Sequence, residues 1–252
     1  MYRRLAHEVL GLPIVGVEAE DAWFLKGGLT ADAVRTALIG DRFVADRRIG
    51  KLLLLDIETG PTLGLRFGMT GRLLLGDRAA IERLEYSSAR IEPEWDRFVV
   101  HFADGTDLRI RDPRRLGGVE LDPDEGRLGP DAATVSPAQL RDALGTSTAP
   151  LKARLMDQAH LAGLGNLLTD EALWRAGLDP ARAAGSLALN ELRRLHRHLR
   201  ATVAELGERG GSHTGDLHEA RIRGGCCPRD GAELARRTIG GRTTYSCPRH
   251  QR

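Results

Sequence analysis

The stretch from Leu151 to Pro180, LKARLMDQAHLAGLGNLLTDEALWRAGLDP, decides the fold of the second half of this chain. Apolar residues at helical spacing predict one helix over 151–160 and another over 168–176, on either side of a glycine-rich centre. Gly163 and Gly165 permit a tight turn there, because glycine adopts backbone conformations that other residues avoid. The sequence therefore predicts a helical hairpin with an unusually tight connection.

Two polar residues of this stretch are suited to a phosphate. Asn166 stands where the second helix begins, so its side chain and the exposed amides of the helix start can hold an anion. Lys152 supplies a cation nearby. An ordinary helical hairpin would show the same glycine turn, so this motif alone leaves both interpretations open.

Outward from this stretch, the chain changes character at a segment rich in Pro, Gly and Asp. Helical patterns continue over 136–144 and 187–206 on the C-terminal side, whereas the N-terminal side contains short apolar runs typical of strands. The predicted strands are Leu52–Ile57, Leu63–Phe67, Arg72–Leu75, Phe98–Phe102 and Leu108–Arg111, with a hairpin turn at Asp104-Gly105 and helices over 2–12 and 30–38. We therefore predict an α+β multidomain protein: a β-sandwich domain with flanking helices over 1–122, a linker over 123–134 and a helical domain over 135–210.

The last part of the chain, 222–252, is predicted to be a small hairpin finger. The formal net charge of +2 is a cancellation, because residues 221–252 carry +6 and residues 1–220 carry −4. A basic segment of this kind suits a polyanionic partner. Arg242 lies at the predicted hairpin turn, where an exposed Arg can enter a groove or clamp a phosphate.

The same segment holds all three cysteines, which favours metal binding over a disulfide framework. Cys227 and Asp230 form one pair, and Cys247 and His250 form a second pair after sixteen intervening residues. This is the spacing of a zinc ribbon that closes around one structural Zn²⁺. Two alternatives stay open: Cys226 could replace Asp230, or the hairpin could be metal-free and packed by Tyr245 and Ile239.

Further motifs carry a family resemblance that spans nearly the whole chain. The segments concerned, besides 151–180 and the finger, are Arg47-Arg48-Ile49-Gly50-Lys51, Gly68-Met69-Thr70-Gly71-Arg72, Asp112-Pro113-Arg114-Arg115-Leu116-Gly117 and Leu128-Gly129-Pro130-Asp131. In order and spacing they resemble the formamidopyrimidine-DNA glycosylase and endonuclease VIII family, in which 151–180 is a helix-two-turns-helix motif. The resemblance implies a bifunctional DNA glycosylase and abasic-site lyase that excises oxidised bases in base-excision repair.

The resemblance also implies roles for individual residues. Lys51 and Arg242 match family residues assigned to the elimination steps. Met69 matches a wedge that enters the base stack, and the Arg114-Arg115 turn faces the orphaned base, with Leu116 in place of the family's aromatic residue. The DNA-contact set implied in this way is Met69, Arg114, Arg115, Leu116, Lys152, Asn166 and Arg242.

The N-terminal residues depart from the family pattern. Family members begin with Pro-Glu, whose amine attacks C1′, whereas this sequence opens Met1-Tyr2-Arg3-Arg4-Leu5 and aligns inside the helix that follows. Two explanations remain: a start codon assigned too far downstream, or a catalytically silent homologue that binds damaged DNA without turning it over. A zinc-ribbon module for protein interaction is a third interpretation.

The lengths of the apolar runs bear on where in the cell the protein acts. No apolar run approaches the roughly 20 residues of a membrane span. We expect a cytoplasmic, nucleoid-associated monomer whose partner is double-stranded DNA that contains a damaged base or abasic site.

Overall fold

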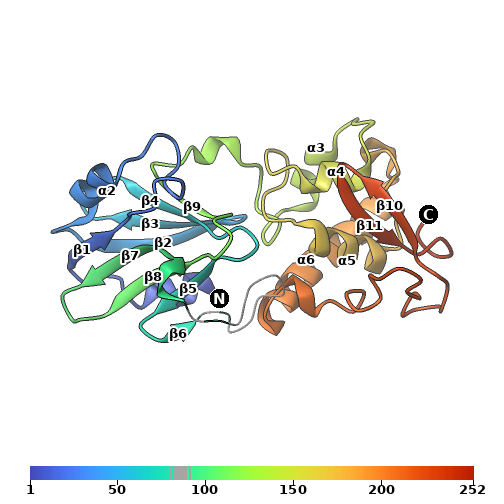
Figure 1. The fold of residues 1–252 in the computed structure, drawn as a ribbon. Coiled ribbons are helices and arrows are strands. Elements are labelled where there is room, and N and C mark those ends of the chain that lie inside the picture. The colour runs from blue at the N-terminus through green and yellow to red at the C-terminus, as the bar shows by residue number, and fades with distance from the viewer. Residues whose placement is uncertain (80, 82–89, 91) are drawn as a thin grey trace. The chain divides into compact units, whose positions relative to one another are not determined.

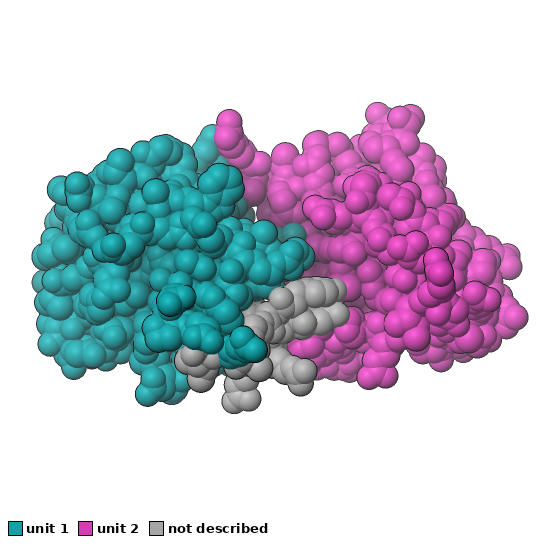
Figure 2. Space-filling model, in the orientation of Figure 1, with its two compact units in different colours: residues 1–124 teal, residues 125–252 magenta. Residues whose placement is uncertain are grey.

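The computed structural model describes residues 1–79, 81, 90 and 92–252. The chain divides into two compact units, residues 1–124 and residues 125–252, which Figure 2 shows in different colours. Each unit has a hydrophobic core of its own. No helix among the described residues is long and apolar enough to cross a membrane.

The first unit is a β-sandwich with two flanking helices (Figure 1). Its elements are α1 Tyr2–His7, β1 Ile14–Glu18, α2 Ala31–Leu38, β2 Phe43–Ile49, β3 Leu52–Ile57, β4 Thr62–Arg66, β5 Arg72–Leu75, β6 Arg78–Ala79, η1 Pro93–Trp95, β7 Asp96–Phe102, β8 Asp107–Arg111 and β9 Gly118–Leu121. One antiparallel sheet has the order β1-β7-β8-β5-β6, and the other has the order β2-β3-β4-β9. The expected β-sandwich is confirmed.

The sandwich core is filled by apolar side chains from both sheets. Strand β3 has the predicted bounds, its leucines are buried, and its backbone is paired on both edges, with β2 and with β4. Helix α2 begins after Thr30, whose side chain accepts a hydrogen bond from the Ala33 amide, so the predicted cap is confirmed. Helix α1 is shorter than predicted: it ends at His7, and turns lead to Gly11, where φ is +80°.

The second unit is helical and carries a two-stranded hairpin. Its elements are η2 Glu125–Arg127, α3 Pro137–Leu144, α4 Leu151–Met156, α5 Asn166–Ala176, η3 Ala184–Ser186, α6 Leu189–Arg209, η4 Ser212–Thr214, β10 Ala235–Ile239 and β11 Arg242–Ser246. Leucines from α3, α4, α5 and α6 form the core. The hairpin of β10 and β11 packs against α5.

Helix α4 ends four residues before the predicted boundary at residue 160. The Asp157 side chain accepts a hydrogen bond from the Ala159 amide at 3.0 Å and contacts His160 Nδ1 at 2.8 Å. These local bonds offer the backbone an alternative to the helix, and that alternative prevails here. The prediction for the end of α5 is confirmed, because Gly177 follows it in the left-handed conformation, with φ +65°.

Candidate nucleic-acid interface and metal centre

In the first unit, Lys51 lies at the tip of the β2–β3 hairpin rather than inside a strand. Ile49 pairs with Leu52, which leaves Gly50 and Lys51 as a two-residue turn. Gly50 has φ +59°, a value that glycine adopts without strain. The exposed Lys51 side chain is therefore presented at the end of a rigid, paired ribbon.

Met69 lies in the loop between β4 and β5, and its side chain is 51% exposed. The neighbouring Thr70 is buried, and its hydroxyl donates to Asp112 Oδ1 at 2.5 Å. Tyr2 of α1 donates from its hydroxyl to the Gly71 carbonyl at 2.8 Å. These two hydrogen bonds thus fix the backbone of the loop, while the Met69 side chain projects into solvent.

The loop over 112–117 is joined to the Met69 loop through Asp112. Besides Thr70, the buried Asp112 carboxylate accepts from the Arg114 amide at 3.2 Å and the Gly117 amide at 2.8 Å. A Cβ at Gly68 would lie 2.7 Å from the Leu116 backbone, so the two loops touch. Met69 and Leu116, the latter 44% exposed, are therefore neighbours on one rigid platform.

Two arginines flank that platform. Arg114 is exposed, and Arg115 has a positive φ of +56° while its guanidinium binds Asp21. The left-handed conformation of Arg115 is uncommon for a residue with a Cβ and is held by the surrounding bonds. The Asp21 carboxylate therefore fixes Arg115 as part of the loop, whereas Arg114 presents its charge outward.

In the second unit, the connection between α4 and α5 is organised by Gln158. Its amide nitrogen donates to the Met156 and Leu164 carbonyls at 2.8 and 3.0 Å, and its oxygen accepts from the Gly163 amide at 2.9 Å. Gly163 has φ +111°, so the expected need for glycine is confirmed there, whereas Gly165 has φ −118°, an extended conformation that does not require glycine. Nothing in the sequence pattern singles out Gln158, because its partners become neighbours only when the turn closes.

Asn166 is the first residue of α5. Its Oδ1 atom is buried and has no hydrogen-bond partner among the described residues, and no side chain caps the start of this helix. A helix N-terminus with unpaired amides carries a partial positive charge. This end of α5 is therefore suited to an anion.

Lys152 differs from the sequence-based expectation. Its side chain is fully buried; Nζ lies 2.7 Å from Asp170 Oδ1 and donates to Thr244 Oγ1 at 2.7 Å and the Thr243 carbonyl at 3.2 Å. Arg221 binds the other oxygen of Asp170. Burial lowers the pKa of the Lys152 ammonium and Asp170 opposes that shift. The charge of Lys152 is thus used inside the protein, where Nζ is paired with Asp170 and is not exposed to solvent.

Arg242 is exposed at the first position of β11, directly after the turn Gly240-Gly241. Both glycines have positive φ, +57° and +72°, as a tight two-residue turn requires. Thr244, which Lys152 holds, donates from its hydroxyl to the Arg242 carbonyl at 3.0 Å. The buried Lys152 therefore supports the backbone that presents Arg242.

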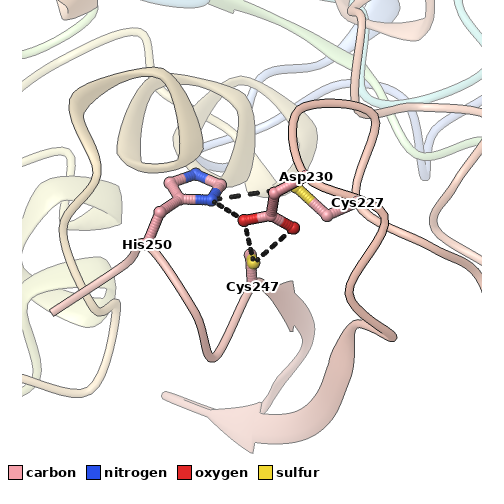
Figure 3. Close-up of side chains that lie close together, drawn as sticks. All are labelled: Cys227, Asp230, Cys247 and His250. Carbon is pink, nitrogen blue, oxygen red and sulfur yellow. Dashed lines mark hydrogen bonds and ion pairs between the residues drawn. The ribbon is translucent and has the colours of Figure 1, made fainter.

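The four predicted metal ligands come together beside this hairpin (Figure 3). One ligand atom from each of Cys227, Asp230, Cys247 and His250 lies within 4.8 Å of all the others. Cys247 Sγ is 3.3 Å from Asp230 Oδ2, which is 3.0 Å from His250 Nδ1, and that nitrogen is 3.8 Å from Cys227 Sγ. Cys226 is exposed and outside this cluster.

These separations are close to those found around a small tetrahedral ion. Zinc bonds of about 2.0 to 2.3 Å place neighbouring ligand atoms roughly 3.3 to 3.8 Å apart. A hydrogen bond from the Ala232 amide holds the pKa of Asp230 well below its usual range, so this ligand is anionic. Burial raises the pKa of the Cys247 thiol, so a bound metal must displace a proton there.

Three features are typical of a nucleic-acid-binding protein: the exposed Met69 beside an exposed arginine, a helix start suited to an anion, and a hairpin that carries Arg242 next to four potential metal ligands. Comparison with known families agrees with this class. Residues 1–119 match the formamidopyrimidine-DNA glycosylase N-terminal domain, and residues 128–217 match the formamidopyrimidine-DNA glycosylase H2TH domain. The chain belongs to the formamidopyrimidine-DNA glycosylase family.

Individual relatives show the same likeness over nearly the full chain. A formamidopyrimidine-DNA glycosylase of Heliobacterium modesticaldum is 35% identical over 99% of this chain and 96% of its own. One from Thermus thermophilus is 36% identical over 98% of this chain and 93% of its own. Among solved structures, the Lactococcus lactis enzyme in complex with FAPY-dG-containing DNA aligns with a TM-score of 0.81 and 25% identity, over 100% of this chain and 97% of that one.

Proposed function

We propose that this protein is a DNA glycosylase of base-excision repair that removes an oxidised base and then cleaves the strand at the abasic site. The observation that carries the proposal is the family match over both units, joined to relatives that share at least a third of their residues with this chain. Solved neighbours hold DNA with FAPY-dG, with carbocyclic 8-oxo-G or with an abasic site. We further propose that the protein acts as a monomer and, since its partner is duplex DNA, at the nucleoid.

The first unit would supply the groups that act at the lesion. A base buried in a duplex must leave the stack before it can be cut from its sugar, and the gap must be filled. The projecting side chains of Met69 and Leu116 are apolar wedges for that gap, and Arg114 can bond the base left without a partner. Asp112 supports this role because it keeps both loops in place when the DNA is opened.

The second unit would hold the backbone of the damaged strand. The unpaired amides and Asn166 at the start of α5 are suited to one phosphate, and Arg242 at the hairpin turn to another. Two fixed phosphates set the position of the sugar between them. This positioning supports amine attack at C1′, since a fixed geometry lowers the entropic part of the barrier.

We assign Lys51 and Arg242 to the elimination steps that cleave the strand. Both are exposed cations at hairpin turns, where they can approach a phosphate or the sugar without losing their support. A cation beside the departing phosphate stabilises the negative charge that develops there.

We assign one structural Zn²⁺ to Cys227, Asp230, Cys247 and His250. The ligand separations and the anionic Asp230 support this assignment. Bound zinc would supply no chemistry to the reaction; it would fix the two ends of the finger and hence the direction in which Arg242 points.

The test is borohydride trapping of the protein, as its gene encodes it, on a duplex with an abasic site. A covalent adduct and a cleaved strand are expected. Lys51→Met should reduce strand cleavage at least tenfold, whereas Lys26→Met, at another lysine of the same unit, should leave it unchanged. Tight, lesion-selective binding without an adduct would instead support a silent damaged-DNA-binding homologue, and no lesion preference would contradict both functions.

A further inference from the structure

Trp174 lies directly behind the four-ligand cluster. It is near the C-terminal end of α5, and its ring is almost fully buried among Leu217, Leu234 and Tyr245. The two cysteine ligands of the cluster belong to the same small core. A helix of the DNA-binding motif thus forms one wall of the metal centre.

Trp174 contacts two of the four ligands through different groups. Its indole Nε1–H donates to Cys227 Sγ at 3.3 Å, and its backbone carbonyl accepts from His250 Nε2 at 3.3 Å. The indole and imidazole rings also meet edge to face, with centroids 6.1 Å apart. The guanidinium of Arg229, between the two ligands of the first pair, lies 4.9 Å from the indole centroid.

The contact with His250 selects the tautomer that a metal needs. With its proton on Nε2 and donated to the Trp174 carbonyl, the ring leaves Nδ1 unprotonated, and Nδ1 is the atom that faces Asp230 and Cys227. Metal-binding histidines commonly donate their second ring N–H to a carbonyl in this way, which fixes the ring and makes it a better ligand.

The contact with Cys227 acts on the thiolate. The buried sulfur must carry negative charge when it binds a metal, and burial alone disfavours that charge. An N–H group aimed at the sulfur offsets part of the cost, and it lowers the energy of the sulfur lone pairs. No other side-chain donor to Cys227 Sγ of comparable distance is found in the part of the chain that the structure describes.

We infer that Trp174 is a positioning residue for the bound metal, holding the Cys227 thiolate with its indole N–H and the His250 ring with its carbonyl. The inference rests on the zinc site of the proposed function. With this role for Trp174, the C-terminal end of α5 is part of the metal centre. Metal binding and the packing of the finger against the helical motif therefore stabilise each other.

The experiment is a titration with Co²⁺ under reducing conditions, which reports affinity and coordination in one absorption spectrum. The proteins are the wild type, Trp174→Phe, which keeps an aromatic ring but removes the N–H, and Trp23→Phe as the matched control in the other unit. We expect Trp174→Phe to bind Co²⁺ about tenfold more weakly. Its thiolate-to-metal charge-transfer band should also move to lower energy, a change that a loss of packing alone does not produce. Trp23→Phe should match the wild type.

The outcomes separate the two proposals. A wild-type protein without a tetrahedral Co²⁺ spectrum would overturn the metal site itself. A wild-type spectrum with unchanged affinity and band position in Trp174→Phe would overturn the role of Trp174 alone. Should that variant not fold, the wild type loaded with an NMR-active isotope of cadmium decides: a scalar coupling between the metal and the Trp174 indole proton is expected, and its absence overturns the inference.

Discussion

Two hairpins of this protein present a cation in nearly the same way, yet they are held by different forces. The β2–β3 hairpin turns at Gly50-Lys51 and the β10–β11 hairpin turns at Gly240-Gly241, directly before Arg242. In each, a glycine with positive φ makes the tight turn. The difference lies in what supports the strands behind the turn.

The β2–β3 hairpin is supported by apolar packing. The side chains of Leu52, Leu53, Leu54 and Leu55 are all buried, and β3 is paired on both edges. Burial of a leucine contributes about 1.5 to 3 kcal/mol, without regard to pH or metal. The hairpin that carries Lys51 is therefore stable without a bound cofactor.

The β10–β11 hairpin is supported by a small apolar core together with buried polar groups. A two-stranded ribbon has little stability of its own. It is fixed by the buried Lys152–Asp170 ion pair at 2.7 Å and by the ligand cluster at its base, while a Cβ at Gly240 would already lie 2.9 Å from Ala153. If the proposed zinc site is occupied, the position of Arg242 depends on metal and buried charge, whereas that of Lys51 does not.

Removal of the metal should have the largest effect, and only on the second hairpin. With free zinc about 1,000-fold above its Kd, binding stabilises the fold by about 4 kcal/mol. Cys247→Ser, or a chelator, should lose this stabilisation and weaken DNA binding, as melting curves and a binding titration would show. Cys226→Ser, at the exposed neighbouring cysteine, should keep one equivalent of metal. Full metal content in Cys247→Ser would contradict the ligand assignment.

Loss of the buried lysine should rank second. Lys152→Met leaves the buried Asp170 carboxylate with Arg221 and the Tyr245 amide, and breaking such an ion pair costs about 3 kcal/mol. Lys51→Met, at the exposed tip of the other hairpin, should change stability by no more than about 0.5 kcal/mol. Denaturant unfolding of both variants measures the contrast, and equal losses would refute the difference between the two supports.

Acid should weaken the β2–β3 hairpin through one carboxylate. Asp56 accepts two bonds from Arg47, at 2.7 and 2.8 Å, and one from Thr62; the bonds from Arg47 lower its pKa below the usual 3.8 despite partial burial. Its contribution is therefore complete above the unfolded-state pKa and is lost as the pH falls through the lower folded-state pKa. Asp56→Asn should flatten that part of the stability curve.

The effect of metal release on the acid limb is common to wild type and Asp56→Asn, so the difference between their unfolding free energies isolates the carboxylate. Asp77→Asn, at a fully exposed side chain, serves as the control and should follow the wild-type curve. If the unfolding free energy of Asp56→Asn changed with pH as steeply as that of the wild type, the Arg47–Asp56 ion pair would contribute nothing to the stability of this hairpin.

The smallest expected effect concerns a single phosphate contact. Arg242→Ala should lower the salt dependence of DNA affinity by about one unit in the log–log slope. Arg236, exposed near the other end of the same hairpin, is the matched position, and Arg236→Ala should retain the wild-type slope. Binding titrations over a range of salt concentrations decide; identical slopes for wild type and Arg242→Ala would remove Arg242 from the phosphate contacts.

Much of the fold was predictable because local signals were strong. The apolar run Leu52–Ile57 marks β3 to the residue, Thr30 caps α2 through its own hydroxyl, and Gly177 ends α5. The end of α4 was not predictable from periodicity, because the Asp157 side chain captures nearby backbone groups before the helix can continue.

The candidate site divides in the same way. Cys227, Asp230, Cys247 and His250 follow a spacing that can be read along the chain, and the structure brings them together. The role of Asp112 was missed although Asp112-Pro113 signals a turn, because its partner Thr70 is 42 residues away in the chain. Trp174 gave no signal at all, since nothing local shows that an indole faces a thiolate.

The sequence by itself determined the strands, the start of α2, the end of α5, the ligand spacing and the family motifs, because each depends on residues close together in the chain. Only the tertiary structure decided which charged side chains are exposed and which are paired inside the protein. Lys152 and Arg242 are both basic residues in motifs that suit DNA, yet one is fully buried against Asp170 and the other is exposed at a turn. Burial depends on what packs against a side chain from elsewhere in the chain, and that is settled only when the finger docks on α4 and α5.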